Sequence, residues 1–193
     1  MYTKLNITEN HLIILSLFTN GFPQLHIRDI ARKCDIAPRT AQLILSDLSK
    51  KGVLTYESKG RTILYSIQIN SISEYYLCLA ESYKKTVFLK KYPEISHLKI
   101  DSKIAIIFGS YAKGIEKKDS DIDLLIIGEY DKNSVKSFEK TYRKTIDVKQ
   151  YPENAFKNPD ILIKEVLQNH VILVGQEFFV NQVLSLKSQT DLS

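Results

Sequence analysis

A glycine–serine turn followed at a fixed distance by two aspartates constrains this chain more than any other feature. The apolar run 103–108 leads directly into Gly109 and Ser110. Ten residues then separate Ser110 from the Asp-Ile-Asp triplet that opens the next apolar run. Because side chains alternate across a strand, Asp121 and Asp123 are expected on one face, with the isoleucine between them in the core.

This arrangement suits phosphate and metal chemistry. Two neighbouring carboxylates repel each other unless a cation lies between them, and hard oxygen ligands favour Mg²⁺. The Gly109-Ser110 turn offers backbone N–H groups and a hydroxyl to phosphates. A third carboxylate, Asp147, lies on the polar face of the strand-like segment 145–151. If that strand neighbours the first, three aspartates converge, as a two-metal phosphoryl displacement requires.

The combined pattern resembles the nucleotidyltransferase (polymerase β-like) superfamily. Its compact form, GSYAKG…SDIDLLI, is similar to the minimal nucleotidyltransferases of prokaryotes, some of which act as antitoxins. The resemblance covers about residues 95–180. It implies that Gly109 and Ser110 contact nucleotide phosphates and that Asp121 and Asp123 hold Mg²⁺, with two ions expected. Asp147 would complete the metal site or assist the acceptor hydroxyl.

The resemblance also sets expectations for substrates. Lys113 stands where family members commonly have arginine, so it can bind phosphate as a cation but without the bidentate fork. The transferred group is usually a nucleoside monophosphate, often AMP from ATP. In the antitoxin branch the acceptor is a tyrosine of a HEPN-type ribonuclease toxin. The residues themselves leave the acceptor open between a protein and a small-molecule hydroxyl, and they leave open a domain that only senses nucleotide.

The N-terminal part has a different pattern and a different charge. Residues 1–70 contain 9 Lys and Arg against 5 Asp and Glu, which accounts for +4 of the net +5. Helices are expected at 8–19, 26–33 and 38–51, followed by strands at 53–56 and 62–67. Over about residues 5–70 this order resembles the winged helix-turn-helix family, and its positive charge suits a polyanion-binding module.

The resemblance implies double-stranded DNA as a partner. The third helix would enter the major groove, and its early residues Arg39, Thr40 and Gln42 would reach base edges. Lys59 and Arg61, in the turn of the hairpin, would contact phosphate or the minor groove. The open alternative is a protein-interaction or dimerisation module, with the arginines simply solvated.

The remaining segments complete the expected α+β organisation. Residues 71–92 predict one long linker helix whose apolar stripe offers a seam for a homodimer. The predicted stripe consists of Ile72, Tyr76, Leu79, Tyr83 and Val87. A helix at 161–169 would present Lys164 and Glu165 to solvent. The expected domains are a winged helix at 1–70, a linker at 71–93, an α/β nucleotidyltransferase domain with a mixed sheet at 94–180, and a frayed tail at 181–193.

Composition excludes several other classes of protein. Hydrophobic residues make up 44% and charged residues 25%, as in globular proteins. No apolar run reaches the length of a membrane span, and the N-terminus lacks a secretory profile. The two cysteines form no CxxC pair, which disfavours disulfide frameworks and zinc sites. A soluble cytoplasmic protein without membrane contact is therefore expected.

Overall fold

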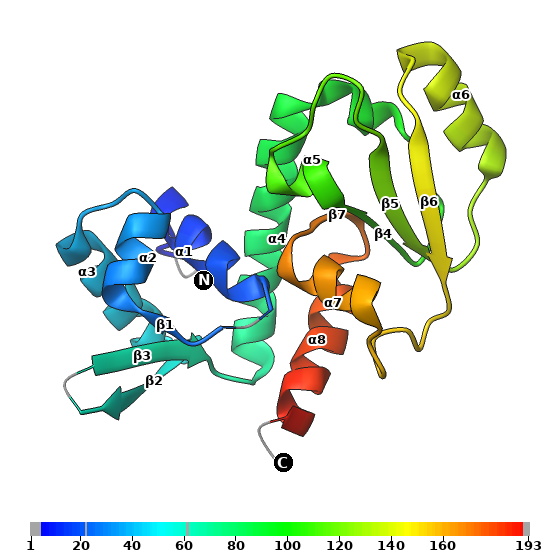
Figure 1. The fold of residues 1–193 in the computed structure, drawn as a ribbon. Helices are drawn as coiled ribbons and strands as arrows, with labels where there is room; N and C mark the ends of the chain where they lie inside the picture. Colours follow the sequence, from blue (N-terminus) through cyan, green and yellow to red (C-terminus); the bar gives the residue numbers. More distant parts are fainter. Residues whose placement is uncertain (1–4, 22, 61, 191–193) are drawn as a thin grey trace. The chain divides into compact units, whose positions relative to one another are not determined.

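The chain divides into two compact units, Met1–Ala80 and Glu81–Ser193. The structure, a computed structural model, describes residues 5–21, 23–60 and 62–190 (Figure 1). The division falls inside a single helix, so each unit contains one part of it. Within the described ranges, no helix is long and apolar enough to cross a bilayer.

Unit 1 begins with three helices. They are α1 (Glu9–Thr19), α2 (Ile27–Lys33) and α3 (Pro38–Lys50). Thr8 precedes α1 as its N-cap, and Pro38 occupies the first turn of α3, where its missing N–H costs no helical hydrogen bond. On α3 the buried side chains are Ala41, Ile44, Leu45 and Leu48. These apolar positions recur every three or four residues, so one face of α3 faces the core.

An antiparallel sheet completes unit 1. Its strands are β1 (Leu25–His26), β2 (Leu54–Lys59) and β3 (Thr62–Ile67), in the order β1-β3-β2. Strand β2 runs to Lys59, which pairs with Thr62, so the hairpin is longer than the sequence pattern indicated. The two-residue strand β1 was not predicted because it has no alternation of its own; Leu25 pairs with Tyr65 of β3 and is buried.

Helix α4 (Ser71–Lys91) has its buried face at other positions than the predicted stripe. Ile72, Leu79 and Val87 are 48%, 41% and 49% exposed, whereas Tyr76 is buried. The buried positions also include Ser73, Leu77, Ala80, Glu81 and Phe88. The predicted stripe is therefore wrong at most positions. Polar Ser73 and Glu81 lie on the buried side, and no hydrophobicity pattern identifies them as such.

A four-stranded mixed sheet forms the centre of unit 2, which confirms the expected mixed sheet. Its strands are β4 (Ile104–Phe108), β5 (Ile122–Ile127), β6 (Ile146–Tyr151) and β7 (Val171–Val174). The order is β6-β5-β4-β7, and β5 and β6 are parallel while the other pairs are antiparallel. Two neighbouring parallel strands begin at the same edge of the sheet, so their first residues lie side by side.

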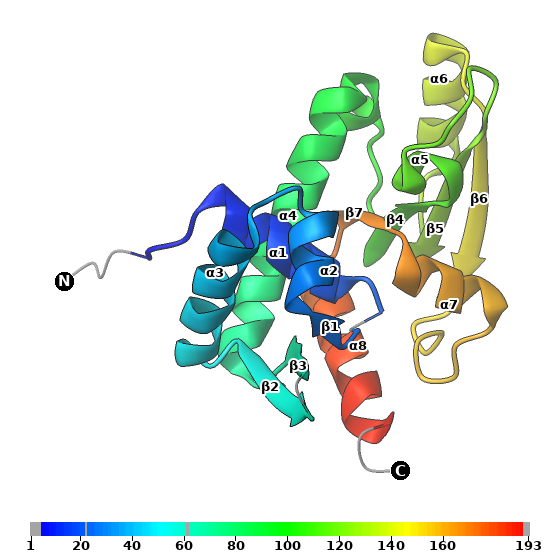
Figure 2. The same cartoon turned by 60° about the vertical axis from the view of Figure 1, so that its left-hand side comes forward.

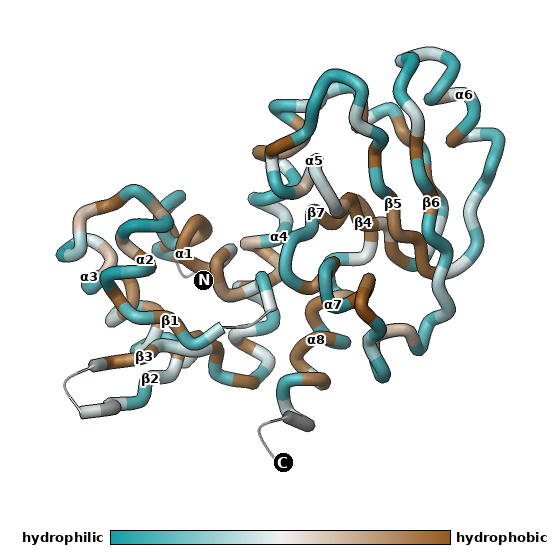
Figure 3. Tube along the Cα trace, viewed as in Figure 1, coloured by the Kyte–Doolittle hydropathy of each residue, from teal (hydrophilic) through white to brown (hydrophobic). Residues whose placement is uncertain are grey.

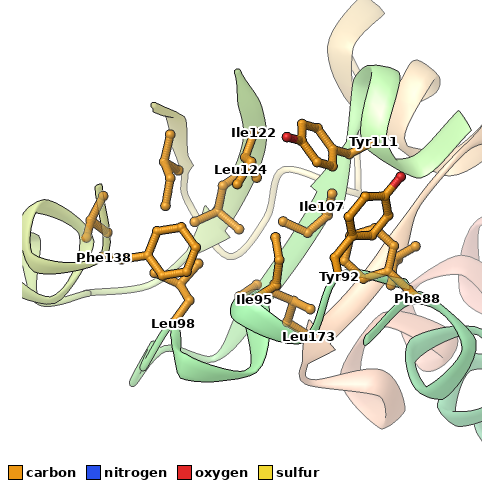
Figure 4. Packing of buried hydrophobic residues seen from close by; sticks show 14 of the residues in the cluster. Phe88, Tyr92, Ile95, Leu98, Ile107, Tyr111, Ile122, Leu124, Phe138 and Leu173 are labelled. Carbon is orange, nitrogen blue, oxygen red and sulfur yellow. The ribbon is translucent and has the colours of Figure 1, made fainter. Parts of the chain in front are cut away.

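Helices cover this sheet on both faces (Figures 1 and 2). They are the 3₁₀ helix η1 (Pro93–His97), α5 (Gly109–Lys113), α6 (Lys132–Tyr142), α7 (Ile161–Gln168) and α8 (Gln176–Thr190). Tyr92 and Phe138 pack with Ile107 and Leu124 in one apolar cluster (Figure 4). Helices α7 and α8 contact β4. On β5, Leu124 and the residues two positions before and after it belong to this cluster. Because side chains alternate along a strand, the residues between them point to the opposite face of the sheet.

Helix α8 corrects the expected tail. The helix continues through residues 181–190, where Val183 and Leu184 are buried. The tail expected from residue 181 is therefore wrong for this segment, while residues 191–193 lie outside the described residues. The segment contains enough apolar side chains to pack, although the polar ending LKSQTDLS resembles a frayed terminus.

A buried polar cluster around His170 predicts acid sensitivity of unit 2. Nε2 of His170 lies 3.2 Å from Glu81 Oε1 and 3.2 Å from Lys84 Nζ, and its Nδ1 lies 2.9 Å from the Val166 carbonyl oxygen. Burial, followed by the charge of Lys84, lowers the pKa of His170. The unfolded chain therefore takes up a proton below about pH 6.5 that the folded chain resists, so stability decreases below that pH by at most about 1.4 kcal/mol per pH unit.

Urea unfolding at pH 7.5 and pH 5.5 measures this effect. The difference in unfolding free energy between the two pH values is expected to shrink in His170→Gln and to persist in His97→Gln, whose imidazole is exposed. An unchanged difference in His170→Gln would contradict the assignment.

Candidate active site

The turn after β4 brings the backbone against a carboxylate. Gly109 has a φ of +64°, a conformation that favours glycine. A Cβ atom at this position would lie 2.8 Å from Cγ of Asp123 on the neighbouring strand. The close approach is possible because Phe108 pairs directly with Asp123 across the β4–β5 ladder. Glycine is therefore required here both for its conformation and for the space that it leaves to the carboxylate.

The predicted aspartates start two adjacent parallel strands. Asp123 of β5 is the register partner of Asp147 of β6, and Asp121 immediately precedes β5. Ile122 and Ile146, which form the preceding register pair, are both buried in the core. Alternation along both strands therefore directs the paired aspartates to the other face of the sheet.

The pKa of Asp123 reflects repulsion from the other acids of the group. Burial raises the pKa of Asp123, and the charges of Asp147, Asp121 and Glu165 raise it further, while Lys149 opposes them. The Lys149 ammonium lies 3.0 Å from Oδ2 of Asp147. Within the described residues, no three His, Cys, Asp or Glu side chains are gathered closely enough to hold a metal ion. The lysine contact neutralises part of the charge of Asp147.

These residues nevertheless fit a divalent cation. The donors are carboxylate oxygens, the ligands that Mg²⁺ prefers, and the half-buried Asp123 carries unfavourable negative charge that a cation relieves. The absence of a Cβ at Gly109 leaves room for the Asp123 carboxylate. Asp121, Asp123 and Asp147 are therefore the candidate ligands for such a cation.

Helix α7 contributes a fourth acid, Glu165, which is exposed as the helix pattern predicted but also contacts the residues after the glycine turn. Glu165 Oε1 accepts a hydrogen bond of 2.7 Å from Nζ of Lys113, the cation of the glycine turn. Its neighbours Ile163 and Val166 are buried, which fixes the helix against the sheet. The local pattern gave no signal for this role, because only the fold brings α7 to the turn.

Three further contacts involve the helix that follows Gly109, the loop before Asp121 and the segment before β6. The Lys117 N–H donates a 2.8 Å hydrogen bond to Oγ of Ser120, which closes the loop just before Asp121. Lys144 donates a 2.9 Å hydrogen bond to the Tyr111 hydroxyl and forms a 3.3 Å ion pair with Glu94. These contacts connect the glycine turn with the segment that leads into β6.

The predicted DNA-contacting residues belong to unit 1. Nη1 of Arg39 donates a 3.0 Å hydrogen bond to Oε1 of Gln42, and both side chains are exposed. Thr40 is half-buried in the same first turn of α3. Lys59 ends β2, and Arg61 lies outside the described residues. Three of the five predicted residues therefore share one end of α3.

The family model described as "Nucleotidyltransferase domain" matches residues 89–186. The chain belongs to the nucleotidyltransferase domain family. The match begins within α4 and ends within α8, so this nucleotidyltransferase domain is longer at both ends than the resemblance over 95–180 indicated. The Gly109 turn and the three aspartates all lie inside the matched range.

Similarity to solved structures is distant. One is the E41A mutant of ZitR from Lactococcus lactis, at 19% identity and a TM-score of 0.38, covering 50% of this chain and 64% of that chain. Another is Sso10a-2, a DNA-binding protein from Sulfolobus solfataricus, at 18% identity and a TM-score of 0.34, covering 49% and 100%. A structure described as a toxin-antitoxin with AMP-PNP shows 16% identity and a TM-score of 0.33, covering 57% and 89%. No curated protein shows significant similarity to this nucleotidyltransferase.

Proposed function

We propose that unit 2 is a Mg²⁺-dependent transferase that moves a nucleoside monophosphate, AMP from ATP, to a hydroxyl group of a protein or a small molecule. The observation that carries this proposal is the pairing of Asp123 with Asp147 at the start of two parallel strands, beside the Gly109 turn. Membership of the nucleotidyltransferase domain family supports it.

Each residue has a defined part in this reaction. Ser110 and the N–H groups of its turn bind phosphate oxygens, and Lys113 neutralises part of their charge. Asp121, Asp123 and Asp147 would hold Mg²⁺, which would supply positive charge to the triphosphate and to the attacking oxygen. The acceptor oxygen bonds to the α-phosphorus, the bond to the bridging oxygen breaks, and pyrophosphate leaves. The hydroxyl proton passes to a carboxylate of the group, for which Asp147 is the candidate.

Transfer of radioactive label tests the proposal directly. Purified full-length protein is incubated with Mg²⁺, with cell lysate as the source of acceptors, and with α-labelled ATP, CTP, GTP or UTP in turn. We expect label from ATP on one protein or one small molecule, whose mass identifies the acceptor; a HEPN-type toxin is one protein to include. Nucleotide binding without any transfer would instead support a regulator that senses nucleotide.

The pair of Lys113 and Glu165 predicts opposite effects on nucleotide affinity. In Lys113→Met the phosphate cation is lost, whereas in Glu165→Gln the lysine is released and a charge that repels phosphate disappears. Both side chains are partly exposed, so each change is expected to be about two- to fivefold. Titration with labelled ATP and Mg²⁺ should show weaker binding for the first variant and tighter binding for the second. Glu153→Gln, which breaks the 2.6 Å Lys103 ion pair elsewhere, serves as the control and should change nothing.

A second proposed function is binding of double-stranded DNA by residues 5–70 as a winged helix. Helix α3 begins with exposed Arg39 and Gln42, and its first turn contains no acidic residue. The following strand β3 pairs with β2 on one side and with β1 on the other, as in the wing of such a domain. The proposal also includes a homodimer, since winged helices commonly read two half-sites.

An electrophoretic mobility-shift assay with genomic fragments tests this second function. We expect a complex that weakens steeply between low and high salt, and a weaker complex for Arg39→Ala at all salt concentrations. Arg32→Ala, which removes an exposed arginine paired with Asp29 at 2.9 Å, is the matched control. Binding that is absent at low salt would reassign residues 5–70 to protein interaction.

A further inference from the structure

Helix α6 carries a row of cations along one face. Lys132, Lys136 and Lys140 are all exposed and lie four residues apart. At 1.5 Å per residue they follow each other about every 6 Å along the axis, turned only slightly from one to the next. Within the residues that the structure describes, none of the three pairs with a carboxylate. Like charges at this spacing destabilise an isolated helix, so a polyanion would stabilise the row.

A polar row and a pocket lie beside these cations. Asn133, Ser137 and Thr141 occupy the next row of α6, and all three line a surface cavity of about 470 Å³. Lys99 and His97 line the same cavity from the segment around the end of η1. The cavity is therefore lined by hydrogen-bonding groups and by the cation of Lys99, and the lysine row of α6 lies on the neighbouring helix positions. The acidic residue at its edge, Asp131, accepts the N–H of Asn133 at 2.8 Å as the cap of α6.

An aromatic surface borders the cavity. The rings of His97 and Tyr142 are nearly parallel, at 16°, with centroids 5.9 Å apart. His97 is exposed, whereas Tyr142 is held against Phe138 at a centroid distance of 4.7 Å. A supported ring with one open side is the arrangement on which a nucleobase stacks.

We propose that this face of α6, with Lys99 and His97, binds a single-stranded nucleic acid. The phosphates would follow the lysine row, the polar row would receive sugar and phosphate oxygens, and a base would stack on His97. A duplex fits less well, because its paired bases do not expose a ring to stack. Figure 3 shows α6 as a largely hydrophilic helix, which excludes an apolar partner surface over most of its length. This binding is independent of the proposed transfer reaction.

Fluorescence anisotropy with labelled oligonucleotides tests the proposal on the full chain. The probes are a 20-nucleotide oligo-U RNA, an oligo-dT DNA of the same length, and a duplex. The test variant is Lys132→Gln/Lys136→Gln/Lys140→Gln. The matched control, Lys90→Gln/Lys157→Gln/Lys164→Gln, removes the same charge from exposed positions elsewhere in unit 2. Any contribution of unit 1 is the same in both variants.

We expect the test variant to lose at least tenfold in affinity for single strands relative to the control variant. Its slope of log affinity against log salt should fall by about 2, for three lost phosphate contacts. His97→Ala should lose at least fivefold with the salt slope unchanged, which separates stacking from charge. Stronger binding of oligo-U than of oligo-dT would assign the site to RNA, and the reverse would assign it to DNA.

Three outcomes would overturn the proposal. One is equal affinity of the test and control variants for single strands. Another is a loss in the test variant that is confined to the duplex. The third is binding of anionic phosphatidylserine vesicles through the lysine row by a protein that binds neither oligonucleotide, which would make the face a membrane contact.

Discussion

Replacing Asp121 and Asp123 together by asparagine is expected to reduce nucleotide transfer by about a thousandfold or more. Asparagine keeps the size of each side chain but removes the two charges that would hold Mg²⁺, and a bound metal supplies several kcal/mol to a phosphoryl transfer. The measurement is transfer of label from ATP at saturating Mg²⁺. Asp101→Asn/Glu129→Gln, which neutralises two exposed acids of the same unit, should retain full activity.

The same double variant is expected to be no less stable than the original chain. Burial and neighbouring carboxylates raise the pKa of Asp123, so its ionised form is unfavourable in the folded protein. Removing that charge relieves the repulsion, and Tm in the presence of EDTA should rise. Lost transfer together with an equal or higher Tm identifies a functional defect. A lower Tm would mean that the aspartates serve the fold, and retained transfer would remove them from the mechanism.

Gly109→Ala is expected to reduce transfer strongly because it displaces one carboxylate. The new Cβ would lie 2.8 Å from Cγ of Asp123 and still closer to one of its oxygens, so the side chain of Asp123 has to leave its present place. The left-handed backbone at this residue adds about 1–2 kcal/mol of strain. We expect a loss of transfer of at least about a hundredfold, larger than the loss of stability explains.

Gly114→Ala separates these two effects. Gly114 ends the same turn with a φ of +69°, but a Cβ there would meet nothing within 4 Å. It should therefore show a similar decrease in Tm with most of its transfer activity retained. Equal loss of activity in both variants would show that backbone strain, and not the contact with Asp123, determines the effect.

The local parts of the site follow from the sequence, and their surroundings do not. The alternation around Ile122 predicts that Asp123 lies outside the core, and strand β5 has this arrangement. That Asp147 lies directly opposite depends on the order of the strands, which no local pattern encodes. The contact of Glu165 with Lys113 could not be predicted for the same reason. The periodicity of its helix indicates a polar face, but only the packing of α7 brings that face to Lys113.

The predictions for α4 and for the end of the chain were wrong for the same physical reason. In α4 the buried face includes Ser73 and Glu81, and in the final helix polar residues alternate with the apolar side chains that pack. Hydrophobic periodicity identifies a buried face only when polar partners are absent from it. The burial of polar groups that have partners therefore cannot be predicted from hydrophobic periodicity. Glu81, whose carboxylate lies 3.0 Å from the Lys84 ammonium, is an example.

One uninterrupted helix, α4, crosses the border between the two units, so neither unit contains the whole of it. Each residue inserted into or deleted from the middle of α4 changes by about 100° which side chains of the following turns share its buried face. Fusion proteins and fragments therefore need their junction before Ser71, where the helix begins, so that the second unit retains the whole helix. A cut at residue 80 would remove backbone hydrogen bonds from the middle of α4.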